Sequence, residues 1–404
     1  MRTYLLSIFI ISNWLLALRD GNLVLDLTNV HNGANKRMFV TITAGQDHTC
    51  AISAAQETYC WGTNANGQLG IGSADTGQHA LPLIIKGQLQ FKEMSAGYTH
   101  TCAITHDGKA YCWGSNSYGQ LGNGSRVSRA APEKVAGNLQ FKSISAGATH
   151  TCAVTLDHKA YCWGGNWHGQ LGTGSFEGQP DAPCCHTTPV PVRTTLNFTL
   201  ISAGGIHTCG IAADAHAFCW GNGNDGRLGG GLMDEKDQPL PVPVAGNFKF
   251  AMISAWGWQT CGVTISDAAY CWGRGSEGQL GLGQLVTLQR SPAPVAGGVR
   301  FSTVRSGPAH TGGLATTGTA YFWGQNNFGQ LGIGSTANSA WPSPVSGQLK
   351  FRMVVAGGNE FSGHSCGITL DGNAYCWGDN RHGQLGDGTA ADKLVPARVK
   401  MGPR

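Results

Sequence analysis

Residues 96–122 read AGYTHTCAITHDGKAYCWGSNSYGQLG, and variants of this stretch recur along the whole chain. Its Trp-Gly dipeptide recurs at seven equivalent positions, 50 to 57 residues apart, at Trp61, Trp113, Trp163, Trp220, Trp272, Trp323 and Trp377. Each unit offers about four short β segments between turns rich in Gly, Asn and Asp. In the second copy these segments are 83–85, 91–95, 101–105 and 109–113. Four strands per unit and seven units predict a seven-bladed β-propeller of four-stranded blades.

The composition independently favours an all-β protein. Among 404 residues, 61 are Gly and only 12% are charged, which argues against long amphipathic helices. The chain is 41% hydrophobic and contains 12 Trp, which argues against disorder. A net charge of only +4 gives no reason to expect a nucleic acid or an anionic membrane as a partner.

The two ends of the chain suggest how the ring closes. The C-terminal segment LVPARV, residues 394–399, matches the Pro-x-x-Val-like segment that opens a repeat, whereas the first copy, near Phe39, lacks such an opener. We therefore expect the C-terminal strand to complete the blade that the N-terminal segment begins, which would remove an exposed sheet edge. The expected organisation is a signal peptide or apolar leader at 1–20, a linker at 21–37 and the propeller at 38–400.

The repeat pattern A-G-x-x-H-T-C-A-[IV]-T…Y-C-W-G-x-N-x-x-G-Q-L-G resembles the regulator of chromosome condensation repeat family over about residues 38–400. Six Trp-Gly blocks are followed by Gly-Gln-Leu-Gly, and the fourth copy has Gly226-Arg227-Leu228-Gly229 instead. The resemblance implies a seven-bladed propeller. It implies little about function, because such propellers serve unrelated tasks.

Twelve of the 14 cysteines form six equally spaced pairs: Cys50 with Cys60, Cys102 with Cys112, Cys152 with Cys162, Cys209 with Cys219, Cys261 with Cys271, and Cys366 with Cys376. In the second copy a three-residue turn at 106–108 places Cys102 opposite Cys112, within reach of a disulfide bond. The sixth copy has Gly312 and Phe322 at the two positions, and this joint loss favours disulfides over the alternative of buried free thiols. No copy has the Cys-x-x-Cys spacing of structural zinc sites, so we expect no metal.

The cysteines and the N-terminus both favour an oxidising compartment. Many disulfides are typical of exported proteins. The apolar run of residues 5–18 is shorter than a membrane span of about 20 residues and fits the core of a signal peptide. We expect a secreted protein without a membrane span; a cytoplasmic or nuclear location is the alternative. The adjacent Cys184 and Cys185 are left open between an interchain bond, another pairing and free thiols.

One polar position recurs in every copy without forming a recognisable catalytic motif. It is His48, His100, His150, His207, His310 and His364, with Gln259 in the fifth copy. We interpret it as a structural hydrogen bond that ties each blade to the next. No catalytic triad, phosphate loop or zinc-protease helix is present, so we expect neither an enzyme with covalent chemistry nor a cofactor.

The places where the repeat becomes irregular are the candidate binding residues. Trp256 and Trp258 flank Gly257 in the fifth copy, and Glu360 and Phe361 lie in an insertion of the seventh. Loops on a propeller face are common binding sites. We therefore expect a non-enzymatic scaffold that binds a protein partner through one face.

The family resemblance supplies two other functions to weigh. One is guanine-nucleotide exchange on a small GTPase of the Ran type, and this activity remains the alternative. The other is ultraviolet-B perception through Gly-Trp-Arg-His-Thr motifs. This chain has only Gly257-Trp258-Gln259-Thr260, which lacks both the Arg and the His.

Overall fold

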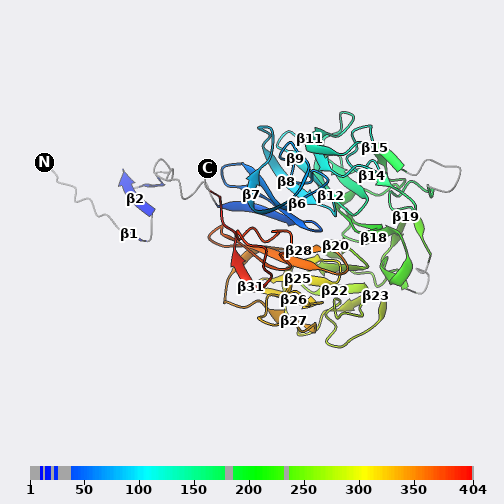
Figure 1. The fold of residues 1–404 in the computed structure, drawn as a ribbon. Helices are drawn as coiled ribbons and strands as arrows, with labels where there is room; N and C mark the ends of the chain where they lie inside the picture. The colour runs from blue at the N-terminus through cyan, green and yellow to red at the C-terminus, as the bar shows by residue number, and fades with distance from the viewer. Residues whose placement is uncertain are drawn as a thin grey trace.

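The protein is described by a computed structural model that covers residues 10–11, 14–19, 22–25, 38–177, 185–231 and 236–402. The predicted all-β, seven-bladed propeller is confirmed: seven four-stranded antiparallel sheets form a ring (Figure 1). A separate three-stranded sheet precedes them, made of β1 (Ile10–Ile11), β2 (Trp14–Arg19) and β3 (Asn22–Leu25). The rest of the expected leader and linker lies outside the described residues. Within the described part of the chain, no helix is long and apolar enough to cross a membrane.

Each blade consists of four consecutive strands, and the first strand of each is the innermost. Blade 1 contains β4 (Phe39–Ala44), β5 (His48–Ser53), β6 (Thr58–Asn64) and β7 (Asp75–Ile84). Blade 2 contains β8 (Phe91–Ala96), β9 (His100–Thr105), β10 (Ala110–Gly114) and β11 (Arg129–Lys134). Blade 3 contains β12 (Phe141–Ala146), β13 (His150–Thr155), β14 (Ala160–Gly165) and β15 (Cys185–Pro191). Blade 4 contains β16 (Phe198–Ala203), β17 (His207–Ala212), β18 (Ala217–Gly221) and β19 (Gln238–Pro243), with a short 3-10 helix at Asn224–Gly226.

The remaining three blades follow the same order. Blade 5 contains β20 (Phe250–Trp256), β21 (Gln259–Thr264), β22 (Ala269–Arg274) and β23 (Leu288–Pro294). Blade 6 contains β24 (Phe301–Ser306), β25 (His310–Ala315), β26 (Ala320–Gly324) and β27 (Ser339–Pro344). Blade 7 contains β28 (Phe351–Gly358), β29 (Gly363–Thr369), β30 (Ala374–Gly378) and β31 (Lys393–Arg398).

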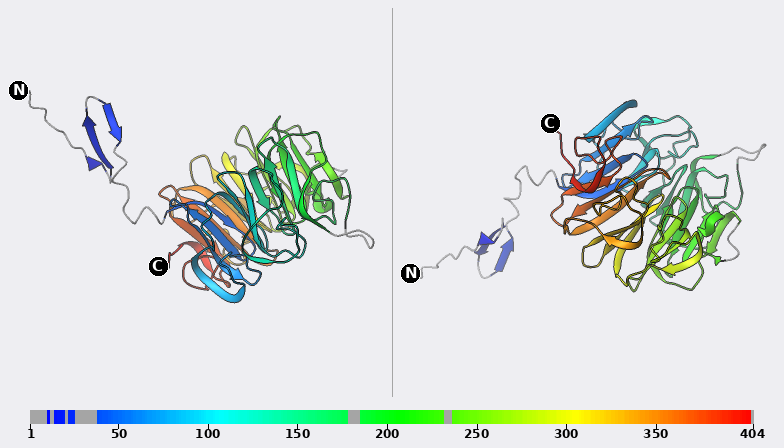
Figure 2. Two further views of the ribbon diagram at one scale, coloured as in Figure 1. Left: turned by 90° about the horizontal axis from the view of Figure 1, so that it is seen from above. Right: turned by 60° about the horizontal axis from the view of Figure 1, so that its bottom comes forward.

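One expectation about ring closure is wrong. The C-terminal strand β31 pairs with β30 as the outermost strand of blade 7 and does not complete blade 1, which is built from β4 to β7. The proline-containing segment, expected to open a repeat, is the last strand of the preceding blade. The first copy therefore lacks nothing, and the ring closes by packing of blade 7 against blade 1, seen side by side in Figures 1 and 2.

The hydrophobic core lies between neighbouring blades. The tryptophan of each of the seven repeated Trp-Gly dipeptides is fully buried. Cys50, Ile52 and Leu69 of blade 1 pack with Phe91 and Trp113 of blade 2, and each following interface is built in the same way. At the closure, Phe39 and Trp61 pack with Leu385 and Val399. Each blade thus needs its neighbour to bury its apolar face, as in other repeat proteins.

The recurring Ala-Gly pair allows these blades to approach each other closely. A Cβ atom at Gly97 would lie 2.3 Å from the carbonyl oxygen of Gly147 in the next blade, closer than any real Cβ contact. Gly147 stands in the same relation to Gly204. The interpretation of this pair as a site of close backbone approach is confirmed.

Hydrogen bonds from the repeated histidines tie consecutive blades together, as predicted. His100 Nε2 lies 2.9 Å from Thr151 Oγ1, and Thr151 Oγ1 donates to the backbone oxygen of Gln120 at 2.8 Å. Because the hydroxyl proton is already donated, His100 must donate Nε2–H to it. The equivalent links join His48 to Thr101, His150 to Thr208, His207 to Thr260, His310 to Ser365 and His364 to Thr49, and Gln259 Nε2 donates to Thr311 Oγ1.

Six disulfide bonds hold the central hairpins of six blades. Cys102 and Cys112 are direct cross-strand partners, with Cα atoms 4.1 Å apart, so the register predicted from the turn length is confirmed. The other five bonds also join the expected pairs: Cys50 with Cys60, Cys152 with Cys162, Cys209 with Cys219, Cys261 with Cys271, and Cys366 with Cys376.

Two places depart from this pattern of bonded hairpins. In blade 6, Phe322 stands where the other blades have their second cysteine, and it packs edge-on against Trp377. In the insertion of the third copy, Cys185 is also disulfide-bonded, so of the three states left open for it the free thiol is excluded. Cys184 lies outside the described residues.

Candidate partner-binding site

A pocket of about 400 Å³ lies where the loops between the first and second strands of the blades converge. We call it the mouth pocket. All seven blades contribute to its lining, which consists of Gln46, Tyr98, Ala148, Gly205, Ile206, Gly257, Trp258, Pro308, Asn359, Glu360 and Phe361. Its volume is at the low end of the usual range for ligand pockets, about 300–1,000 Å³.

Two irregular hairpins raise side chains around this pocket. In blade 7, the amide oxygen of Asn359 accepts hydrogen bonds from the backbone N–H groups of Phe361 and Ser362, at 2.8 and 3.0 Å. These bonds satisfy the backbone of a tight loop between β28 and β29. The loop leaves Phe361 75% exposed at its tip. In blade 5, β20 and β21 extend to a pair of Trp256 with Gln259 and turn through Gly257 and Trp258.

The structure brings together three of the four predicted binding residues. Trp258, Glu360 and Phe361 line the mouth pocket. The guanidinium of Arg274 lies 4.4 Å from the centroid of the Trp258 ring, which fixes that ring by a cation–π contact. Trp256 is placed differently. It is only 7% exposed and lines the central channel, with its ring 5.4 Å from that of Tyr98.

Tyr98 and Arg274 belong to the site although the sequence did not single them out. Burial, with a smaller contribution from the negative charge of Glu360, raises the pKa of Tyr98 to about 12. The phenol is therefore a neutral hydrogen-bonding group at the base of the pocket. A signal was available, because Tyr98 occupies the third position of the Ala-Gly-x-x-His pattern, where other copies have Gln46, Ala148 and Gly205.

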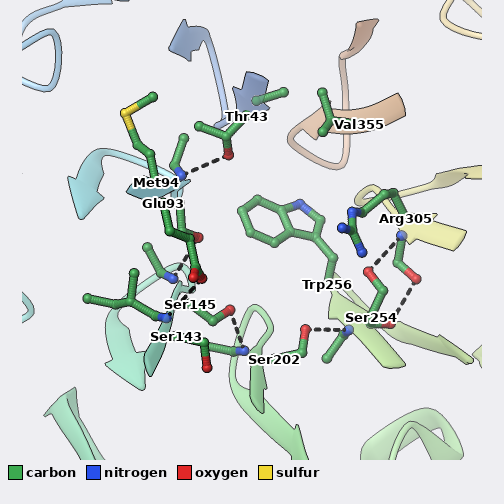
Figure 3. A pocket seen from close by; sticks show the side chains of 18 of the residues that line it. Thr43, Glu93, Met94, Ser143, Ser145, Ser202, Ser254, Trp256, Arg305 and Val355 are labelled. Carbon is green, nitrogen blue, oxygen red and sulfur yellow. Dashed lines mark hydrogen bonds between the residues drawn. The ribbon is translucent and has the colours of Figure 1, made fainter. Parts of the chain in front are cut away.

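The seven innermost strands line a channel with a second cavity of about 330 Å³ (Figure 3). Hydroxyl groups of Thr43, Ser95, Ser145, Ser202 and Ser254 each accept a hydrogen bond from a backbone N–H group of the next blade, at 2.9 to 3.0 Å. These bonds make the wall rigid. Within the described residues, no three His, Cys, Asp or Glu side chains gather in a way that would hold a metal ion.

Together these features define a class of protein: a closed propeller whose rigid blades present loops around a pocket at one mouth of the channel. The family model of the regulator of chromosome condensation (RCC1) repeat matches residues 57–104, 107–154, 157–211, 266–314, 317–363 and 371–404. A second model of this repeat matches residues 39–68, 91–120 and 141–170. The protein belongs to the RCC1 repeat family, as the sequence pattern predicted.

Relatives of known identity share this architecture. The chain is 31% identical to the ultraviolet-B receptor UVR8 of Arabidopsis thaliana over 366 residues, which cover 89% of this chain and 70% of that receptor. Prp20p of Saccharomyces cerevisiae, described with its binding to Gsp1p and histones, superposes with a TM-score of 0.74 at 22% identity, over 91% of this chain and 88% of that one. Human WBSCR16 superposes with a TM-score of 0.75 at 19% identity, over 85% of this chain and 94% of that one. The two structural likenesses establish the fold.

Proposed function

We propose that this protein is a non-enzymatic interaction propeller that binds a protein partner through the mouth pocket. The observation that carries the proposal is Phe361, a large aromatic side chain that is 75% exposed beside a concave surface. Exposed apolar groups next to a pocket are typical of protein interfaces, and aromatic residues are frequent energetic anchors there.

The residues that line the mouth pocket suggest which side chains of the partner would contact it. Ala148, Ile206 and Pro308 give the wall an apolar surface, and Glu360 places a carboxylate at its edge. We propose that an apolar side chain of the partner enters the pocket and that a neighbouring Lys or Arg of the partner meets Glu360. The rigid blades lower the entropy cost of presenting these loops.

We further propose that the protein works outside the reducing compartments of the cell. All twelve cysteines of the blade hairpins are bonded in pairs and fully buried. Such bonds persist in oxidising surroundings and are rare in the cytosol. A cytoplasmic or nuclear location is the alternative, and it goes with the exchange-factor function.

The alternative function is nucleotide exchange on a Ran-type GTPase, motivated by the fold shared with Prp20p, which is described with its binding to Gsp1p and histones. Ultraviolet perception of the kind named for UVR8 is not proposed. In the segment compared with the Gly-Trp-Arg-His-Thr motif, Gln259 follows Trp258, and this Gln259 is fully buried and bonded to Thr311.

One experiment separates the two candidate functions. The full-length, disulfide-bonded protein is immobilised and used to select peptides from a random display library, while GDP release from Ran is followed in parallel. We expect selected peptides to share an apolar residue next to a basic one, and GDP release to remain at its spontaneous rate. Acceleration of GDP release by orders of magnitude would favour the exchange factor and overturn our proposal.

A further inference from the structure

One position of the channel wall departs from its repeat. The fifth residue of the innermost strand is a Ser or Thr in blades 1 to 5 and Val355 in blade 7, but Arg305 in blade 6. Among the described residues, the Arg305 guanidinium reaches only the carbonyl oxygen of Val304, at 3.4 Å, and the sulfur of Met252, at 3.6 Å. Among the ion pairs of the described residues none involves Arg305. A cation in a confined channel without a counter-ion destabilises the folded protein unless a bound ligand supplies the opposite charge.

An unpartnered donor lies beside this cation. Trp256 projects its indole into the cavity between the innermost strands, and its ring nitrogen lies on the side of Arg305 (Figure 3). Within the described residues no acceptor meets Trp256 Nε1, although the side chain is buried, with only 7% of the residue exposed. Buried indole N–H groups normally find a partner. Two donors on one side of a cavity, both without a strong acceptor, point to a missing anion.

Glu93, the acidic group across the cavity, does not act as the missing counter-ion of Arg305. Glu93 lies on the opposite wall in Figure 3 and accepts a hydrogen bond from the backbone N–H of Ile144 at 3.1 Å. Burial is the main cause that raises the pKa of Glu93, and the hydrogen bond from Ile144 and the positive charges of Lys92 and Arg305 oppose this shift. Near it, the hydroxyl of Ser143 has no partner among the described residues. Glu93 is thus bonded on its own side of the channel, and among the described residues it forms no ion pair with Arg305.

The second residues of the innermost strands include basic side chains but no acidic ones. The second residue of these strands is exposed, and in three blades it is basic: Lys92, Lys142 and Arg352. The other four are Val40, Thr199, Ala251 and Ser302, so none is acidic. All seven strands begin at the same end of the channel, the end away from the mouth pocket.

We propose that the central channel binds a small organic carboxylate, whose oxygens accept hydrogen bonds from the Arg305 guanidinium and from Trp256 Nε1. A planar carboxylate matches the forked donors of arginine. Leu200 and Met353, which also line the cavity, give an apolar surface for the rest of the ligand. A volume of about 330 Å³ restricts the ligand to a small molecule.

The test is isothermal titration calorimetry on the full-length, disulfide-bonded protein with three probes: benzoate, succinate and inorganic phosphate. Benzylamine, similar in shape to benzoate but cationic, is the negative control. We expect saturable binding of at least one of the two carboxylates, weaker binding of phosphate and no binding of benzylamine. Arg305→Met should weaken carboxylate binding at least tenfold. Trp256→Phe, which keeps an aromatic ring but removes the N–H, should weaken it severalfold.

The controls protect this test against misfolding. Arg300→Met removes an exposed arginine at the surface, paired with Asp267, and should leave carboxylate binding unchanged. Because Arg305 has no paired counter-ion, Arg305→Met without ligand should melt at the same or a higher temperature than the wild type. Should Arg305→Met fail to fold, Arg305→Lys retains the charge but loses the fork and is expected to bind severalfold more weakly. Absence of carboxylate binding, tighter binding of phosphate, or binding unaffected at Arg305 would each overturn the proposal.

Discussion

The buried histidines decide how the protein responds to acid. Desolvation lowers the pKa of His48, His100, His150 and His310 to about 3, from an ordinary value of 6.5. Several of these rings have no acceptor at Nδ1 within the described residues, so a second ring proton would be buried without a partner. The folded ring thus stays neutral at pH values where the unfolded chain takes up protons.

These low pKa values predict that the folded protein loses stability in acid. The unfolded state binds more protons than the folded state between pH 6.5 and about 3, so stability falls as the pH drops through this window. Each such histidine lowers the free energy of unfolding by about 1.4 kcal/mol for every pH unit below about 6.5. We expect the melting temperature to be nearly constant above about pH 7 and to fall steeply between about pH 6.5 and 4 in a thermal unfolding series.

Blade 5 supplies the variant that isolates this effect. Gln259 makes the same link to the next blade without a titrating group. We expect His100→Gln to unfold near the wild-type temperature at about pH 7.5 and to lose less stability at about pH 5. His106→Gln, at an exposed hairpin turn, is the matched control and should reproduce the wild-type pH profile. If His100→Gln and the wild type decline in parallel, the buried histidines are not the cause.

At the scale of single residues, the sequence predicts the roles of positions that recur in nearly every repeat better than those of residues that occur in one repeat only. The cysteine pairs and the histidine links recur in nearly every copy, so a single hairpin register and one type of partner explain them all. Trp256 and Trp258 are different, because they stand two residues apart at the end of one strand. Only the observed hairpin shows that Trp256 faces the channel while Trp258 lines the mouth pocket.

At the scale of strands and hairpins, blade 6, which lacks the hairpin disulfide, can be compared with the six blades that have it. Its hairpin, β25–β26, pairs Gly312 with Phe322 where other blades have bonded cysteines. A disulfide across about eleven residues is worth about 2–3 kcal/mol. We expect the amides of β25 and β26 to exchange hydrogen faster than those of any other central hairpin, as measured by mass spectrometry.

A variant of blade 2 tests the cause of that difference. Replacing Cys102 and Cys112 together by Ala removes one bond. Exchange in β9 and β10 should then rise to the level of blade 6 or beyond, while the distant blade 5 should change little. Unchanged exchange in blade 2 would mean that packing, and not the disulfide, holds these hairpins.

The sequence predicts the positions of the strands, but it does not correctly predict how they are grouped into blades. The predicted strand positions agree closely with the observed ones; the predicted segment 91–95, for example, is β8 (Phe91–Ala96). A periodic pattern, however, does not state which strand begins a blade. The outermost strands carry prolines such as Pro132, Pro342 and Pro396, which suit a sheet edge because they donate no ladder hydrogen bond. That property could have assigned the proline-containing segments to the outer edge.

At the scale of the whole molecule, the interface between blade 7 and blade 1 closes the ring and should contribute to its stability. Deleting residues 394–404 would remove most of β31 and expose the packing of blade 7 on blade 1, where Val399 is buried with Phe39 and Trp61. We expect a clear drop in the melting temperature, measured by circular dichroism. A deletion variant as stable as the wild type would show that the closing interface does not depend on this segment.

The central claim is that a rigid propeller binds its partner through the mouth pocket. The most direct test is the affinity of a display-selected partner peptide, measured by calorimetry for the wild type, Phe361→Ala and Trp341→Ala. Both aromatic side chains are more than half exposed, at 75% and 55%, but Trp341 lies on the outermost strand β27, away from the pocket. We predict that Phe361→Ala weakens binding at least tenfold with an unchanged melting temperature, and that Trp341→Ala binds like the wild type. Equal affinities for Phe361→Ala and the wild type, or a loss confined to Trp341→Ala, would contradict the account.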